Sequence, residues 1–263
     1  MTAAGLAAAT GAGMGVESLW QSGFPALGLT PLDVAAFIWF LLCTVGYNLV
    51  TSTRTIWRQS LVGAIQSHRM AWMMHMAHRT DRVIDVLLIS SLAGGNSFFA
   101  STSIVILGAL SALLGLGERA QAILDRIPFS VHAAAMAWDL KVLTLMVVMV
   151  YAFFKFAWAF RLAHYSMIMM GATPPDTKGD AAAREALAER ACRVAGLAAE
   201  HGNLGLRSYY FAMAGLAWFI HPALFLIATT LVVLIVTRRE FFSRTLAIVS
   251  DTPTTTISML PRI

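Results

Sequence analysis

Residues 142–161, VLTLMVVMVYAFFKFAWAFR, form an apolar run that contains one lysine, Lys155. A helix of about 20 apolar residues spans the roughly 30 Å hydrocarbon core of a bilayer. An ammonium group inside that core is costly unless it is paired, hydrated or able to reach the lipid headgroups. The run therefore predicts a membrane-spanning helix, and the environment of Lys155 is what most needs explaining.

The composition extends this prediction to the whole chain. The 263 residues are 58% hydrophobic and 13% charged, whereas soluble domains average about 45–50% and about 25%. The net charge is +5, but the basic residues do not gather on a soluble domain with aromatic platforms, which argues against nucleic-acid binding. Cys43 and Cys192 form no CxxC pair, so we expect no disulfide framework. The chain has the composition of a polytopic membrane protein.

The apolar segments and their breaks predict an all-α fold with four transmembrane helices. We expect spans at residues 32–50, 95–116, 139–161 and 209–236, the second beginning after a break at Gly94-Gly95. The third helix should project beyond the bilayer, because its periodicity continues to Pro174. An Ala/Gly-rich arm (1–31) precedes this membrane domain (32–244), and a short tail (245–263) follows it.

Two further segments have the pattern of amphipathic helices, which we expect on the cytoplasmic side. Residues 53–89 alternate arginines with large apolar side chains, as in a helix on the membrane surface or an extension of the next span. Residues 181–204 have a narrow Ala-rich face, which favours packing against another helix.

The distribution of Lys and Arg predicts an orientation, because cytoplasmic loops carry the excess of these residues. With four crossings, an outside N-terminus places eleven Lys and Arg residues inside and seven outside. We therefore expect a bacterial inner-membrane protein with a periplasmic N-terminus and both termini outside. The basic C-terminal tail argues against that side for the C-terminus.

Three motifs carry a resemblance to a known family. They are FFASTS (residues 98–103), YAFFKFAWAFR (151–161) and HGNLGLRSYYFAMAGLAWFIHP (201–222). In this order they resemble the family catalogued as domain of unknown function 599, multi-pass membrane proteins of bacteria and plants, over about residues 32–244. The resemblance implies a membrane fold and location, and it carries no established activity.

The environment of Lys155 has three open interpretations. Tyr151, Lys155, Trp158 and Arg161 are three or four residues apart and share one stripe of the third helix. The lysine could snorkel to the headgroups, bind an anion, a ligand or a carboxylate of another helix, or serve helix pairing alone.

One acidic residue is expected to form a structural ion pair. Asp85 lies near the basic end of the second span. We expect it to pair with Arg161 or Arg207 at the cytoplasmic boundary, because each group would offset the other's desolvation.

Histidines raise the question of a metal or cofactor. His221 precedes Pro222 near the middle of the predicted fourth span, where a neutral histidine hydrogen-bonded to another helix is the favoured interpretation; haem ligation, a proton relay or a quinone contact are the alternatives. His75 and His78 lie in a Met-rich tract at a spacing that suits copper. Flanking arginines favour a packing helix there, so we expect no metal ion and no cofactor.

The sequence contains no GxSxG, HExxH or Glu-x-x-His motif and no phosphate-binding glycine loop, so we expect no enzyme. The preferred function is a channel- or carrier-like homo-oligomer that handles an anionic solute or lipid along a polar path. The candidate contacts are Lys155, Arg161, Arg207, Tyr151, Trp158, Asn96, Ser101 and Tyr209. The alternatives are a scaffold or accessory subunit of a larger membrane complex and, third, a haem- or copper-binding protein. Membrane lipids are the expected small-molecule partners.

Overall fold

The computed structural model describes residues 28–124, 126, 134–175 and 180–250. Over these residues it contains helices and no strand. Four helical stretches are long and apolar enough to cross a membrane, namely Pro31–Thr51, Val83–Gly115, Ala135–Ala172 and Pro222–Ser250. The all-α membrane fold expected from the sequence is confirmed. The Ala/Gly-rich arm up to residue 27 and the tail beyond residue 250 lie outside the described residues.

The first span begins with a helix-capping motif. α3 (Pro31–Leu41) follows Thr30, whose hydroxyl accepts a hydrogen bond from the Asp33 backbone N–H, while the Asp33 carboxylate accepts one from the Thr30 backbone N–H. This capping box, with Pro31 in the first helical position, satisfies groups that a helix start leaves free. A π-helical turn, η2 (Leu42–Gly46), and α4 (Tyr47–Thr51) continue the span.

The second span is one unbroken helix. α5 (Arg54–Gln59) and α6 (Leu61–Ala77) lead to α7 (Val83–Gly115), and α8 (Gly117–Leu124) follows. α7 continues through Gly94 and Gly95, so the expected break is wrong. A Cβ added at either glycine would meet no atom within 4 Å. Packing of α7 along α9 keeps the helix continuous despite the weak helix propensity of two glycines.

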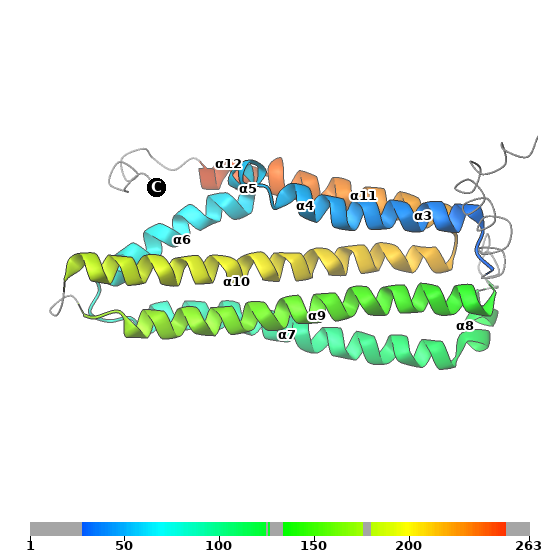
Figure 1. The fold of residues 1–263 in the computed structure, drawn as a ribbon, viewed down its shortest axis with the longest axis horizontal. Helices are drawn as coiled ribbons and strands as arrows, with labels where there is room; N and C mark the ends of the chain where they lie inside the picture. Colours follow the sequence, from blue (N-terminus) through cyan, green and yellow to red (C-terminus); the bar gives the residue numbers. More distant parts are fainter. Residues whose placement is uncertain (1–27, 125, 127–133, 176–179, 251–263) are drawn as a thin grey trace, which may run out of the picture.

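The remaining helices are α9 (Ala135–Ala172), α10 (Ala181–Leu216), the 3-10 turn η3 (Ala217–Phe219), α11 (Pro222–Phe241) and α12 (Arg244–Ser250). α9 reaches Ala172, as its periodicity predicts. Within the described residues the chain runs along the long axis five times, through α3–α4, α7, α9, α10 and α11 in alternating directions (Figure 1).

The bundle has an apolar half and a basic half. The apolar half, at the right of Figure 1, contains α3, α4, α11 and the adjoining parts of α7, α9 and α10. The basic half, at the left, contains α6, α12 and the other parts of the three long helices. Its exposed arginines include Arg79, Arg161, Arg190 and Arg193. The sequence-predicted amphipathic segments lie in this half as α6 and the first part of α10.

The predicted fourth span, a single helix with His221 near its centre, is wrong. α10 ends at Leu216, η3 turns the chain, and α11 starts at Pro222 and runs back along α10. Pro222 occupies the first turn of α11, where a missing N–H costs nothing. The His221 side chain caps the same helix by accepting from the Ala223 backbone N–H at 3.0 Å. His221 therefore lies in the turn between η3 and α11 and caps α11.

This turn also changes the placement of the chain ends. With five passes, the described chain begins at the outer end of the apolar half and ends in the basic half (Figure 1). The expectation of both termini on one side counted α10 and α11 as one helix, whereas in the bundle α3 begins and α11 ends at opposite ends (Figure 1). Arg238 and Arg239 in the last turn of α11 and Arg244 in α12 lie with the other basic segments.

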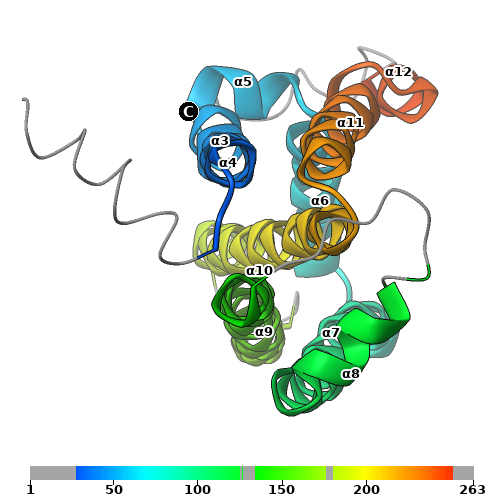
Figure 2. The ribbon, with the colours of Figure 1, turned by 90° about the vertical axis from the view of Figure 1, so that its right-hand side faces the viewer.

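α10 is the central helix of the bundle, and Figure 2 shows it between α3, α4 and α11 on one side and α9 and α7 on the other. Its buried residues are mostly small, including Ala188, Ala191, Ala195, Ala198 and Gly205. Small side chains allow close helix packing in membranes. The Ala-rich stripe seen in the sequence therefore packs against other helices, as predicted.

A buried ion pair connects helices at the end of the apolar half that is farther from the basic half. Lys141 Nζ on α9 lies 3.3 Å from Asp33 Oδ1 on α3, and both side chains are buried. Trp218 in η3 donates its Nε1–H to Asp33 Oδ1 at 2.8 Å, and its backbone oxygen accepts from Lys141 at 3.1 Å. The two charges satisfy each other and fix the turn between α10 and α11 against α3 and α9.

Candidate functional site

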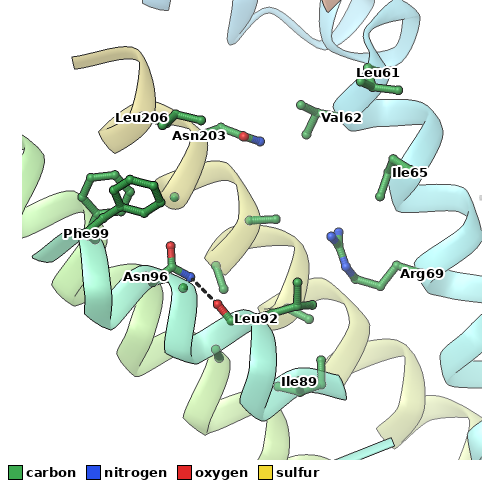
Figure 3. Close-up of a pocket in the computed structure, with 17 residues that line it drawn as sticks. Leu61, Val62, Ile65, Arg69, Ile89, Leu92, Asn96, Phe99, Asn203 and Leu206 are labelled. Carbon is green, nitrogen blue, oxygen red and sulfur yellow. Dashed lines mark hydrogen bonds between the residues drawn. The ribbon is translucent and has the colours of Figure 1, made fainter. Parts of the chain in front are cut away.

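A groove of the described structure lies between α6, α7 and α10, and we call it the α6–α7 groove. It has a volume of about 430 Å³. Its walls are apolar side chains of α6 and α7, and α10 forms the floor (Figure 3). The apolar residues of the walls include Leu61, Val62, Ile65, Ile89, Leu92 and Phe99.

The floor is open because α10 carries small residues there, Ala195, Ala198, Ala199 and Gly202. A Cβ added at Gly202 would lie 2.7 Å from Asn96 Oδ1, so even a methyl group would displace the Asn96 amide. The Ala/Gly pattern of residues 195–202 thus creates both close helix packing and the space of the groove.

Arg69 of α6 is the only charged side chain among the residues that line the groove, and it points into it (Figure 3). Its guanidinium donates to Gln66 Oε1. No acidic side chain of the described residues forms an ion pair with it. Burial lowers the pKa of Arg69 from its ordinary value, yet a guanidinium stays protonated in proteins. The groove therefore contains a permanent, partly desolvated cation whose hydrogen-bond acceptor is a neutral amide, that of Gln66.

A second layer of contacts holds Arg69 in place. Gln66 Nε2 lies 3.4 Å from the backbone oxygen of Cys192 and 3.5 Å from its Sγ on α10. Burial raises the pKa of the Cys192 thiol to about 11, so this thiol is neutral at physiological pH and does not serve as a counter-ion. Gln66 thus connects α6 to α10 and orients the guanidinium toward the groove.

Two amides add hydrogen-bonding capacity. Asn96 of α7 and Asn203 of α10 are half-buried and line the groove. Asn96 Nδ2 donates to the Leu92 backbone oxygen at 3.3 Å, and its Oδ1 points into the groove (Figure 3). The groove thus combines apolar walls with one cation and two carboxamides.

The groove lies where the apolar half meets the basic half. Phe99 and Leu206 line its inner part, toward the apolar half, while Arg69 lies farther into the basic half (Figures 1 and 3). Leu61 and Arg69 are eight residues apart in α6, about 12 Å by helical rise. The charge of Arg69 therefore lies toward the basic half, and the apolar surface around Leu61 lies toward the apolar half.

In the sequence, Arg69 belongs only to an amphipathic pattern, and it was not predicted as a site residue. Of the predicted contacts, Asn96 alone lines the groove. No local motif marks Arg69, because its isolation depends on α7 and α10, which contribute no carboxylate near it.

The predicted stripe on α9 faces away from this groove. Tyr151 and Trp158 are exposed, and the Lys155 ammonium lies 5.1 Å from the centre of the Tyr151 ring. Arg161 donates to the Tyr165 hydroxyl at 3.0 Å. Lys155 and Tyr151 are therefore one pair, and Arg161 belongs to another pair that begins six residues farther on.

Arg207 is buried in a closed network. Its Nε and Nη2 donate to the two carboxylate oxygens of Glu240 on α11 at 3.0 and 2.7 Å. Nη1 donates to Thr51 Oγ1 at 2.7 Å and to Asn48 Oδ1 at 3.2 Å on α4, and the Tyr47 hydroxyl donates to Glu240 at 3.0 Å. The sequence analysis missed Glu240 as the partner, and with it in place Arg207 is not free to attract a mobile anion.

Asp85 forms an ion pair, but the expected partners are wrong. Its Oδ1 accepts from Trp72 Nε1 at 2.6 Å and from Arg79 at 3.2 Å. α7 starts at Val83 and continues through Gly94 and Gly95. Asp85 therefore lies in the first turn of this long helix, at the far end of the basic half, next to the loop that carries Arg79. Arg161 and Arg207 are on other helices and bind the partners described above.

The remaining predicted residues are not brought together. Ser101 is exposed on α7, so it does not edge a path with Asn96. The Tyr209 hydroxyl lies 2.9 Å from Ser103 Oγ and donates to the Phe99 backbone oxygen at 2.9 Å, which ties α10 to α7.

The histidine tract of α6 has no metal-site geometry. His75 is exposed, and His78 Nε2 lies 3.2 Å from Glu185 Oε1. Over the residues that the structure describes, no group of three or more His, Cys, Asp or Glu side chains is placed to hold a metal ion.

Comparison with known proteins supplies a family and no activity. No curated protein matches the chain, and no solved structure matches it either. The model of the family described as "Protein of unknown function, DUF599" matches residues 35–245, which include the α6–α7 groove and all but the outermost residues of the first and last candidate spans. The chain therefore belongs to the DUF599 family.

Proposed function

We propose that this protein binds an anionic membrane lipid in the α6–α7 groove, with the headgroup on Arg69 and the hydrocarbon along the apolar walls. The observation that carries the proposal is a guanidinium without an ionic partner that points into an apolar groove. A desolvated cation of this kind is strongly stabilised by an anion, and guanidinium binds phosphate or carboxylate oxygens in a bidentate manner.

The shape and lining of the groove select an amphiphile over a small hydrophilic ion. A volume of about 430 Å³ lies within the roughly 300–1,000 Å³ range of ligand pockets. Most of the lining is apolar, and the charge is at the end toward the basic half. A lipid oriented along the bilayer normal would match this gradient.

A carrier-like or lipid-sensing role fits this arrangement better than an open channel. A channel needs a wet path through the apolar half. The buried charges there, Asp33 with Lys141 and Arg207 with Glu240, are bonded to each other. Of the two ligands expected from the sequence, an anionic solute and an anionic lipid, we therefore favour the lipid. It would bind to one chain or to a homo-oligomer.

A scaffold or accessory role is the second candidate, and one surface favours it. In the basic half, beyond the level of Arg161, α7 exposes Val83, Ile84 and Leu87 to 62–67%. Apolar side chains outside the hydrocarbon core are commonly covered by a protein partner. The scaffold role would be favoured if a second protein co-purified in stoichiometric amount and contacted this face of α7, and if no lipid were bound in the groove.

For orientation we propose that the basic half is cytoplasmic, in a bacterial inner membrane, with the N-terminus periplasmic and the C-terminus cytoplasmic. The support is the positive-inside rule applied to five passes. In a Cys43→Ala/Cys192→Ala background, Glu118→Cys should react with a membrane-impermeant maleimide from the periplasm. Thr245→Cys should react only after the inner membrane is permeabilised. Equal labelling of both positions from the periplasm would contradict this orientation.

The binding proposal is tested by titrating the purified protein in detergent micelles with phosphatidylglycerol and counting bound lipids by native mass spectrometry. Arg69→Gln should weaken the groove-bound lipid at least about tenfold, because a charged hydrogen-bonded contact is lost. The matched control is Arg193→Gln, an exposed arginine whose partner is Glu189. Ala199→Phe, which fills the floor of the groove, should have the same effect as Arg69→Gln.

Three results would overturn the proposal: an unchanged affinity in Arg69→Gln, an equal loss in Arg193→Gln, or equal binding of phosphatidylcholine.

A further inference from the structure

A second groove lies on the opposite side of α10, and we call it the α4–α9 groove. Its volume is about 480 Å³. One wall is formed by η2 and α4, the other by α9, and the floor by α10; the lining residues are Thr44, Val45, Asn48, Leu49, Ser52, Val147, Val148, Tyr151, Leu204 and Ser208. In Figure 2, α3 and α4 lie above α10 and α9 lies below it, on the side away from α6 and α7.

This groove opens toward the lipid. Val45, Leu49 and Val147 line it and are 54%, 66% and 69% exposed, on helices apolar enough to cross the membrane. Side chains with this exposure at membrane depth contact hydrocarbon. A lipid chain lying between α4 and α9 would therefore cover apolar surface that the protein itself leaves open.

A π-helical turn shapes the α4 wall. η2 (Leu42–Gly46) interrupts the α-helical geometry of the first span beside the groove. Thr44 Oγ1 is buried and has no hydrogen-bond partner among the described residues. Such π turns inside α-helices are frequently found at functional sites. The groove thus contains a local distortion and an unused hydroxyl in addition to its apolar walls.

One lysine and one histidine, whose pKa is lowered by burial and by the lysine charge, lie at the end of the groove that faces the basic half. Lys155 follows Tyr151 by one turn of α9, and its ammonium is 5.1 Å from the Tyr151 ring centre. On α10, His201 precedes the floor residue Leu204 by one turn, and it is close enough to Lys155 for an electrostatic interaction. The His201 Nδ1 atom is buried without a hydrogen-bond partner, and Glu200 is the acid that also acts on this ring.

Lys155 lacks the acidic partner that two buried cations of the bundle have. Lys141 and Arg207 are paired with Asp33 and Glu240, whereas no acidic residue of the described chain lies within ion-pair distance of Lys155. Arg161 marks the basic half six residues later, about 9 Å by helical rise. From a position this close to the basic half, a half-buried lysine can extend its ammonium toward lipid phosphates.

We propose that the α4–α9 groove is a second binding site for an anionic phospholipid of the leaflet next to the basic half. Its acyl chain lies along Leu49, Val147 and Tyr151, and its phosphate contacts Lys155 and His201. The ring of Tyr151 restricts the lysine stem by a cation–π contact, which directs the charge to one place on the groove rim. This inference does not depend on the lipid proposed for the α6–α7 groove, because the two sites share no lining residue.

The test is a lipid count by native mass spectrometry, with phosphatidylglycerol titrated into the detergent-solubilised full chain. Lys155→Gln should weaken one bound lipid at least about tenfold and leave the Arg69-dependent lipid unchanged. Lys155→Arg should restore binding, since it keeps the charge. Leu49→Trp, which occupies the groove without removing a charge, should lower the count in the same way as Lys155→Gln.

The two proposals fail separately in this experiment. Loss of binding in Arg69→Gln alone, with Lys155→Gln equal to wild type, would overturn the second site and leave the first. Loss in Lys155→Gln alone would overturn the first site and support the second. Equal retention of phosphatidylcholine and phosphatidylglycerol by the Lys155-dependent site would also overturn an assignment based on headgroup charge.

Discussion

Replacing Glu240 by alanine should lower the free energy of unfolding by about 3–5 kcal/mol, because it leaves a buried guanidinium without its counter-ion. Arg207 and Glu240 are 7% and 4% exposed and share two hydrogen bonds of 3.0 and 2.7 Å. Without Glu240, Arg207 keeps only the neutral oxygens of Thr51 and Asn48. The loss should appear in SDS-induced unfolding from mixed micelles, followed by circular dichroism.

Two further variants separate this effect from a general loss at the end of α11. Arg238→Ala, an exposed neighbour in α11, should change stability by no more than about 0.5 kcal/mol. The double variant Arg207→Met/Glu240→Met should recover most of the lost stability, because apolar residues of similar volume remove both charges together. If Glu240→Ala were as stable as Arg238→Ala, the network would not hold α4, α10 and α11 together.

Gly205→Ala and Gly94→Ala should change stability in opposite directions. A Cβ at Gly205 would lie 2.8 Å from the Phe156 ring. Phe156 is 1% exposed, and its ring packs against Phe99 and Tyr209 with ring centres 5.2 and 5.6 Å away, which limits its movement. Overpacking of this kind costs about 1–3 kcal/mol. At Gly94 the added methyl meets no atom within 4 Å, and alanine should stabilise α7 by about 0.5–1 kcal/mol.

The same unfolding measurement in mixed micelles distinguishes these glycines. A destabilised Gly94→Ala would indicate that α7 does break at the glycine pair, as hydropathy alone suggests. A neutral Gly205→Ala would mean that α9 and α10 are not packed at the distance described here.

Features that depend on local pattern could be predicted from the sequence. The first and third membrane helices, the later part of the second, the projection of α9 to Ala172 and the packing face of α10 all follow from apolar length and periodicity, whereas the start of α7 at Val83 does not. The family could be predicted as well, because its motifs are contiguous stretches, and the matched residues 35–245 agree with that resemblance.

The turn at His221 could not be predicted in the same way. A proline within a long apolar stretch fits a kinked helix and fits the first residue of a new helix equally well. What decides between them is the long-range network of Trp218 with Asp33 and Lys141, which lie 185 and 77 residues away in the sequence. Hydropathy contains no record of such contacts.

The candidate site was hidden for a related reason. Lys155 is conspicuous in the sequence because it interrupts an apolar run, while Arg69 is one of many arginines in a basic segment. The distinction of Arg69 is an absence of nearby carboxylates, which arises only when α6, α7 and α10 assemble. Arg207 and Asp85 show the converse. In the folded protein they form ion pairs with Glu240 and Arg79, so their charges are not available to a ligand.

The most direct test of anionic-lipid binding is photo-crosslinking in nanodiscs with a phosphatidylglycerol that carries a diazirine near its headgroup, followed by peptide mapping. Enriched labelling of α6 near Arg69 and of α10 around Asn203 is expected, with suppression by excess unlabelled phosphatidylglycerol and by Arg69→Gln. Labelling spread evenly over the lipid-exposed faces of α7, α9 and α11, and unchanged by Arg69→Gln, would contradict the proposed function.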